Sequence, residues 1–118
     1  MADARPVGSL GEEAALRVYE RLGYALVARN WRCRIGELDL VVSRRGTMVV
    51  CEVKTRRGTG FGGGYEAVTG RKQAKVRAVA EAFLQATRSR PESVRFDVAS
   101  VLVRSRGAVA VELFEDAF

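Results

Sequence analysis

Apolar residues recur along this chain at two different spacings, and the spacing separates helices from strands. From Ser9 to Leu22 they fall at helical intervals, and Gly23 follows as a stop signal, so the pattern predicts a helix. A second helical pattern begins at Thr69, a suitable cap, and continues to about Arg88. Two helices are therefore expected, well separated in the sequence.

Five shorter segments have the alternating or continuous apolar character of strands. They are Tyr24–Trp31, Glu37–Arg44, Thr47–Lys54, Val94–Arg104 and Ala108–Phe114. The resulting order is α-β-β-β-α-β-β. Because a helix crosses between the third and fourth strands, those two strands can lie parallel in one sheet. The predicted fold class is α/β, with a mixed β-sheet flanked by α-helices.

Length and composition set the broad class of the protein. The 118 residues favour a single domain, 1–118, in which residues 1–8 form a flexible N-terminus. No apolar run approaches the roughly 20 residues that span a bilayer, and the first residues lack the apolar stretch of a secretion signal. We therefore expect a cytoplasmic protein without a membrane partner. In that setting Cys33 and Cys51 are interpreted as small buried apolar residues.

The charge of the chain points to a class of partner, and its residue types exclude several mechanisms. A net charge of +6 and a pI near 10.0 favour a polyanion such as nucleic acid, the alternative being a solvated basic surface with no ligand. The chain has no histidine, which excludes Ser-His-Asp, Cys-His and His-based zinc catalysis. Any enzymatic chemistry must therefore use carboxylates, Lys, Tyr or a metal ion held by oxygen atoms.

The second and third strands form a hairpin whose pairing sorts its charges onto one face. If Arg45-Gly46 is a two-residue loop, Arg44 pairs with Thr47 and the register is fixed. The apolar face then consists of the opposed pairs Leu38–Val53, Leu40–Cys51 and Val42–Val49. On the other face Asp39 lies opposite Glu52, and Glu37 lies opposite Lys54.

Two carboxylates directly opposed in a sheet repel each other, so something must offset the charge of Asp39 and Glu52. A hard divalent cation such as Mg²⁺ does so, because it prefers carboxylate and water oxygens. Lys54 points to the same side as Glu52 and can reach a metal-bound water or a phosphate. The alternative is a solvated ladder in which Lys54 neutralises Glu37.

Other charged and aromatic residues have two interpretations each. Glu12 follows Ser9 at the spacing of a capping box, or is a further carboxylate near the metal. Trp31 stacks on an unpaired base, or makes a core or dimer contact. Asp97, in an apolar strand, is expected to bond to structural partners. The basic residues either contact phosphates or form solvated surface; they are Arg56, Arg57, Arg71, Lys72 and Lys75.

A glycine-rich segment, RRGTGFGGG at 56–64, contains the spacing G-x-G-x-x-G without the helix that a dinucleotide-binding or P-loop motif requires. We interpret it as a mobile loop beside the strand that carries Glu52 and Lys54. In that position it is able to close over the backbone of a substrate.

Several short motifs, taken in order, resemble one protein family. They are Gly11-Glu12, Gly23-Tyr24, Arg29-Asn30-Trp31, Gly36-Glu37-Leu38-Asp39-Leu40, Glu52-Val53-Lys54-Thr55-Arg56, Ala67-Val68-Thr69 with Lys72-Gln73, and Arg95-Phe96-Asp97-Val98. Over about 8–118 this series resembles the YraN-like family, which is similar to Holliday junction resolvases and belongs to the PD-(D/E)xK nuclease superfamily. In place of the superfamily's proline before the first acid, this chain has Leu38.

The resemblance implies a restriction-endonuclease-like fold and a metal-dependent DNA endonuclease acting on branched or single-stranded DNA. Asp39 and Glu52 would bind Mg²⁺ or Mn²⁺ with help from the Val53 carbonyl, and Lys54 would be the catalytic lysine. Glu12 matches a helical acid of the resolvase-like members, so we include it among the expected catalytic residues.

The resemblance further implies a homodimer and a DNA partner rather than an RNA one. Two alternatives stand beside catalysis. One is a non-catalytic nucleic-acid-binding module on a nuclease fold, and the other is a protein-interaction adaptor.

Overall fold

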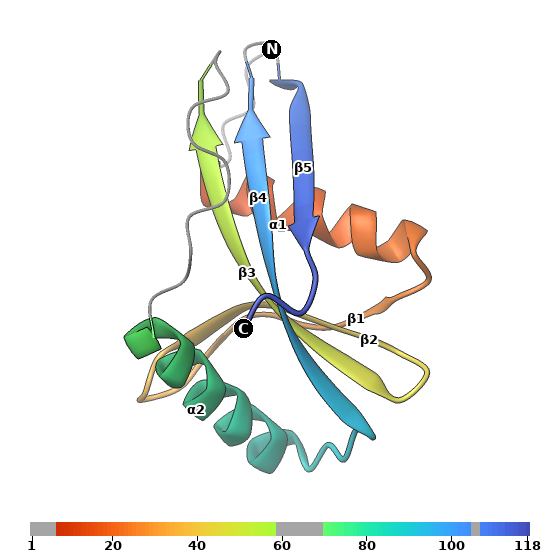
Figure 1. Cartoon of the computed structure of the whole chain (residues 1–118), viewed down its shortest axis with the longest axis vertical. Helices are drawn as coiled ribbons and strands as arrows, with labels where there is room; N and C mark the ends of the chain where they lie inside the picture. The colour runs from red at the N-terminus through yellow and green to blue at the C-terminus, as the bar shows by residue number, and fades with distance from the viewer. Residues whose placement is uncertain (1–6, 59–69, 105–106) are drawn as a thin grey trace.

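The computed structural model describes residues 7–58, 70–104 and 107–118, which form two helices and one five-stranded sheet (Figure 1). The elements are α1 (Val7–Arg21), β1 (Ala25–Arg32), β2 (Glu37–Arg44), β3 (Thr47–Arg57), α2 (Gly70–Thr87), β4 (Ser93–Val103) and β5 (Val109–Phe114). The strands lie in the order β1-β2-β3-β4-β5, with β3 and β4 parallel and the other neighbours antiparallel. The predicted α/β class, the order of elements and the parallel pair across α2 are confirmed.

The two helices cover opposite faces of the sheet, and each closes its own hydrophobic core. On one face Ala15 and Tyr19 of α1 pack in a buried cluster with Leu40, Cys51 and Val101. The other face holds a second cluster, whose buried members are Leu38, Val41, Met48, Val50, Val76, Val79, Ala80, Phe83 and Phe96. A sheet covered on both faces explains why its central strands read as almost continuous apolar runs.

The hairpin between β2 and β3 turns through two residues, as predicted. Arg45 and Gly46 have φ values of 48° and 82°, the positive values that a tight hairpin turn of this length requires. Pairing then runs from Arg44 with Thr47 to Leu40 with Cys51. The predicted register is therefore confirmed over this part of the hairpin.

Beyond Leu40 the two strands separate, and the rest of the predicted pairing is wrong. The described ladder between β2 and β3 has no Leu38–Val53 or Asp39–Glu52 pair. Leu38 packs in the cluster under α2, whereas Val53 packs against the cluster under α1. The predicted continuous apolar face is thus interrupted at Leu38.

The separation follows from the partner that β3 keeps. Its parallel pairing with β4 continues through Arg57 with Val103, so β3 runs on with β4 while the β1–β2 ribbon turns away (Figure 1). A backbone N–H left without a strand partner must find another acceptor. The N–H of Val53 donates to the Asp39 carboxylate at 2.9 Å, so a side chain of β2 bridges the opening between the strands.

Some predictions fall outside the described residues. These are the glycine-rich loop beyond Gly58, the Thr69 cap of the second helix and most of the flexible N-terminus. Neither α1 nor α2, in the part of the chain that the structure describes, is both long and apolar enough to cross a membrane.

Candidate active site

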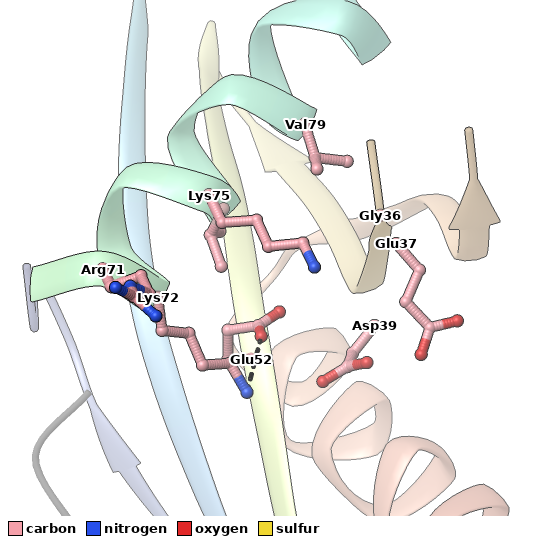
Figure 2. Close-up of a pocket in the computed structure, with 9 residues that line it drawn as sticks. Gly36, Glu37, Asp39, Glu52, Arg71, Lys72, Lys75 and Val79 are labelled. Atoms are coloured by element: carbon pink, nitrogen blue, oxygen red, sulfur yellow. Dashed lines mark ion pairs between the residues drawn. The ribbon is translucent and has the colours of Figure 1, made fainter. Parts of the chain in front are cut away.

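A cleft of about 470 Å³ opens where β2 and β3 separate beneath the first turns of α2 (Figure 2). Its lining residues are Gly36, Glu37, Asp39, Glu52, Arg71, Lys72, Lys75, Val76 and Val79. The strands supply three carboxylates, and the helix supplies three cationic side chains above them. The cleft therefore has one acidic and one basic wall.

Glu52 is the most deeply placed carboxylate of the cleft. The residue is only 5% exposed, and its Oε1 lies 3.6 Å from the Lys72 ammonium. Its Oε2 is buried and has no hydrogen-bond partner among the residues that the structure describes. Burial, reinforced by the negative charge of Asp39, raises the pKa of Glu52 to about 7, although the charges of Lys72 and Lys54 act in the opposite direction. A buried carboxylate oxygen without a partner is costly, and a bound cation would offset that cost.

Asp39 is half-buried and lies near Glu52 on the acidic wall. Its Oδ2 accepts the N–H of Val53, while burial raises the pKa of the carboxyl above its ordinary value. The Val53 N–H and the charges of Lys72 and Lys54 partly counteract this, whereas the negative charge of Glu37 adds to it. Asp39 thus both anchors the two strands and holds negative charge beside Glu52.

Glu12 has a different role from the predicted helix cap. The helix is already formed at Val7, so Ser9 lies inside α1. The Glu12 carboxylate, in a residue 9% exposed, instead accepts a hydrogen bond of 3.0 Å from the Asn30 side chain. Burial raises the pKa of Glu12, and the negative charge of Asp39 raises it further. The structure therefore brings Glu12 into the electrostatic neighbourhood of the acidic wall.

Two residues that sequence reasoning missed help to position Glu12. Asn30 has a φ of 52°, a left-handed conformation that Asn tolerates better than most residues, and from there its amide reaches Glu12. Gly11 packs so closely on β3 that a side-chain Cβ at this position would overlap Thr55. The motifs Gly11-Glu12 and Arg29-Asn30-Trp31 are visible in the sequence, but only the folded chain relates them to each other.

The basic residues divide into two groups. Arg71, Lys72 and Lys75 are exposed and line the cleft, so the structure brings them together with the carboxylates. Arg56, half-buried, and Arg57, exposed, lie farther along β3 and do not line it.

Lys54 is half-buried, and by the alternation of β3 it points to the same side as Glu52. The predicted pairing of Lys54 with Glu37 is wrong, because the ladder between β2 and β3 ends at Leu40 with Cys51 and Glu37 instead lies 2.9 Å from Arg32. The positive charge of Lys54 instead acts on the carboxyls of Asp39 and Glu52, where it offsets a small part of the rise in pKa that burial causes.

The packing of three further sets of residues bears on their interpretation. Trp31 contacts Phe83 edge-to-face, with ring centroids 5.2 Å apart, which is the core contact that the sequence left open. Asp97 is fully buried among hydrogen-bond donors, as expected of a structural residue. Cys51 is buried and Cys33 partly so, and both are free thiols. Stacking of a base on Trp31 stays a prediction.

The donor set of the acidic wall fits a hard divalent cation. Across 7–58, 70–104 and 107–118, no three Asp, Glu, Cys or His residues gather closely enough to form a metal cage. Mg²⁺ does not need one, because it commonly keeps several waters and takes one or two protein carboxylates. Asp39 and Glu52 are the two carboxylates that would be available to it, and within the described part of the chain the Glu52 Oε2 has no hydrogen-bond partner. Participation of the Val53 carbonyl stays a prediction.

The raised pKa of Glu52 makes the stability of the metal-free protein depend on pH. A carboxyl that holds its proton more tightly when folded favours folding below its ordinary pKa of 4.5, and this contribution is lost as the pH rises towards 7. We expect Glu52→Gln to raise the free energy of unfolding in EDTA at pH 8 by about 2 kcal/mol, because it removes a buried charge. Urea unfolding of both proteins at several pH values measures this difference. Below pH 4.5 the difference should vanish, and a gain independent of pH would contradict the assignment.

Comparison with known proteins places the chain in a family. A family model described as "Uncharacterised protein family UPF0102" matches residues 11–101. A UPF0102 protein of Frankia alni is 49% identical over 112 residues, which cover 95% of this chain and 93% of that protein. UPF0102 proteins of Parafrankia sp. and Pelotomaculum thermopropionicum are 43% and 44% identical over the full length of both chains. The chain therefore belongs to the UPF0102 family, in agreement with the YraN-like resemblance of its motifs.

Proposed function

We propose that this protein is a metal-dependent endonuclease that hydrolyses phosphodiester bonds in DNA, with branched or single-stranded DNA as its substrate class. The observation that carries the proposal is the buried Glu52, whose unpartnered Oε2 shares a cleft with Asp39 beneath a basic wall. Carboxylates on one side and cations on the other suit a substrate phosphate approached together with a divalent cation. The resemblance to PD-(D/E)xK nucleases supports the same assignment.

Asp39 and Glu52 would hold Mg²⁺ or Mn²⁺, with help from the Val53 carbonyl. When bound, such a cation activates water and neutralises charge on the scissile phosphate. Lys54 orients the attacking water and stabilises the charge that develops on the phosphate. Glu12 does not line the cleft, but it accepts a hydrogen bond from Asn30 and would add negative charge near Asp39 from the side of α1.

The basic wall positions the nucleic-acid backbone. Arg71, Lys72 and Lys75 come from the first turns of α2 and line the cleft, with the Lys72 ammonium beside Glu52 (Figure 2). Contacts of this kind fix the register of a nucleic acid without reading its sequence. We assign Arg56 and Arg57 to phosphates farther along the strand, because they continue β3 past the cleft. A preference for DNA structure rather than base sequence follows.

The proposal is tested by incubating the protein with junction, flap and single-stranded DNA in Mn²⁺ and in EDTA. We expect cleavage of at least one substrate in Mn²⁺ and none in EDTA. Calorimetry of Mn²⁺ binding first tests whether the protein has a metal site. Analytical ultracentrifugation of the same sample tests the homodimer that the resemblance implies. Absence of both Mn²⁺ binding and cleavage would contradict the proposal. Binding of DNA that is sensitive to salt but not to EDTA, without cleavage, would favour the non-catalytic binding module.

A further inference from the structure

The ammonium of Lys72 lies beside the buried carboxylate of Glu52 and supplies a positive charge there. Its Nζ lies 3.6 Å from the Glu52 Oε1, shown as the dashed line in Figure 2. The two partners differ in their access to solvent, because the side chain is 48% exposed in Lys72 and 7% in Glu52. The carboxylate is therefore fixed in the protein interior, while the cation reaches it from outside on a flexible stem.

Lys72 is also placed to reach a nucleic-acid phosphate. It is the third residue of α2, on the helix turn that forms the mouth of the cleft. A partly exposed ion pair of this length contributes only about 0.2–1 kcal/mol, so exchanging it for another partner costs little. A divalent cation, with twice the charge and direct bonds to oxygen, competes well for the same carboxylate.

We propose that the Lys72 ammonium takes the place of the cation beside Glu52 in the metal-free protein, and moves to a phosphate of the bound nucleic acid when a divalent ion enters the cleft. The inference rests on the proposed function and adds a positioning role for one residue of the basic wall. It makes binding of the metal and binding of the phosphate backbone depend on each other through a single side chain.

Two consequences follow from this exchange. Removing the ammonium should strengthen metal binding, because the metal no longer has to displace it. The same change should weaken the effect of the metal on nucleic-acid affinity, since the released lysine contributes part of that effect. Coupling between two ligands is reciprocal, so Mn²⁺ should raise the affinity for nucleic acid by the same factor by which nucleic acid raises the affinity for Mn²⁺.

The first experiment measures Mn²⁺ affinity by calorimetry, without DNA, for the wild type and three variants. We expect Lys72→Ala to bind Mn²⁺ about threefold more tightly, because an ion pair worth about 0.2–1 kcal/mol corresponds to a factor of about 1.4 to 5. Lys72→Arg keeps the charge and should remain near the wild type. Lys75→Ala is the matched control: it removes one positive charge from the same helix and cleft, and the ion pair on Glu52 is that of Lys72. Its Mn²⁺ affinity should stay within about twofold of the wild type.

The second experiment measures binding of labelled single-stranded DNA by fluorescence anisotropy, with phosphorothioate linkages to slow hydrolysis. We expect Mn²⁺ to strengthen binding by the wild type about threefold more than binding by Lys72→Ala. In Lys75→Ala the loss of affinity should be similar with Mn²⁺ and with EDTA.

The results separate this inference from the proposed function. If the wild type binds no Mn²⁺ and cleaves no DNA, the proposed function fails, and the exchange fails with it. If the wild type binds Mn²⁺ and Lys72→Ala binds it equally or more weakly, the exchange is overturned while the metal site stands. Both outcomes can be measured because we expect Lys72→Ala to fold: Lys72 lies on the exposed side of α2, where alanine is a good helix former. Circular dichroism confirms that each variant is folded.

Discussion

Asp39→Asn is expected to slow DNA cleavage by at least about a hundredfold and to weaken Mn²⁺ binding, while the protein stays folded. The asparagine carbonyl oxygen can still accept the N–H of Val53, which the Asp39 carboxylate accepts at 2.9 Å in the native chain. The bridge between the separating strands is then kept, and only the negative charge is removed. Cleavage rate and Mn²⁺ calorimetry, measured on the same preparation, test the two parts of this expectation.

Two further variants separate the charge of Asp39 from its anchoring role. Asp39→Ala removes both, so it should lose cleavage as Asp39→Asn does and also about 1–2 kcal/mol of stability, because the Val53 N–H loses its acceptor. Glu37→Gln is the matched control, a carboxyl that lines the same cleft but pairs with Arg32. Its cleavage rate should fall less than about threefold. Wild-type cleavage and Mn²⁺ affinity in Asp39→Asn would contradict a metal role for this residue.

The sequence predicts the hairpin well where local rules decide it. A two-residue loop containing Gly46 fixes the turn, and the alternation of apolar residues fixes the register as far as Leu40 with Cys51. The prediction of the register fails where pairing with a strand distant in the sequence decides the geometry. β3 stays paired with its parallel partner β4 after its pairing with β2 has ended, and the residues of β2 and β3 do not indicate where they separate.

The part of the hairpin whose register is predicted wrongly is the part that forms the candidate site. The predicted direct opposition of Asp39 and Glu52 does not form, yet both line one cleft, because the separation leaves a gap that the carboxylates face. The pattern of charges therefore predicts that Asp39 and Glu52 lie together, although the strand pairing from which this follows does not form. The sequence predicts the basic residues only as phosphate contacts or solvated surface. The position of Arg71, Lys72 and Lys75 across the cleft from the carboxylates depends on how α2 packs.

The role of a buried acid is also difficult to predict from the sequence alone. Asp97 and Glu52 are both carboxylates within apolar strands, and their immediate sequence does not tell a structural acid from a functional one. Packing does. Asp97 is surrounded by donors, whereas one oxygen of Glu52 has no hydrogen-bond partner within 7–58, 70–104 and 107–118. This difference assigns Asp97 to the stability of the fold and predicts a large effect of removing it.

Asp97→Ala is expected to lower the free energy of unfolding by about 3–5 kcal/mol, the cost of breaking a buried ion pair. The carboxylate accepts the Tyr19 hydroxyl at 2.6 Å and the Arg95 guanidinium at 2.9 and 3.0 Å. It also accepts the backbone N–H of Asp116 at 2.9 Å, which ties the end of the chain to β4. Without the carboxylate, a fully buried hydroxyl and a mostly buried guanidinium are left without their acceptor. Urea unfolding measures the loss.

Asp116→Asn is the matched control for Asp97→Ala. It keeps the backbone N–H that donates to Asp97, and Asn tolerates the φ of 53° at this position, so stability should change by less than about 0.5 kcal/mol. Because Asp97 contacts Tyr19 of α1 and lies on the face of the sheet opposite α2, the folded fraction of Asp97→Ala should still bind Mn²⁺ with wild-type affinity. A stability loss below about 1 kcal/mol, or loss of Mn²⁺ binding by the folded variant, would contradict a purely structural role for this carboxylate.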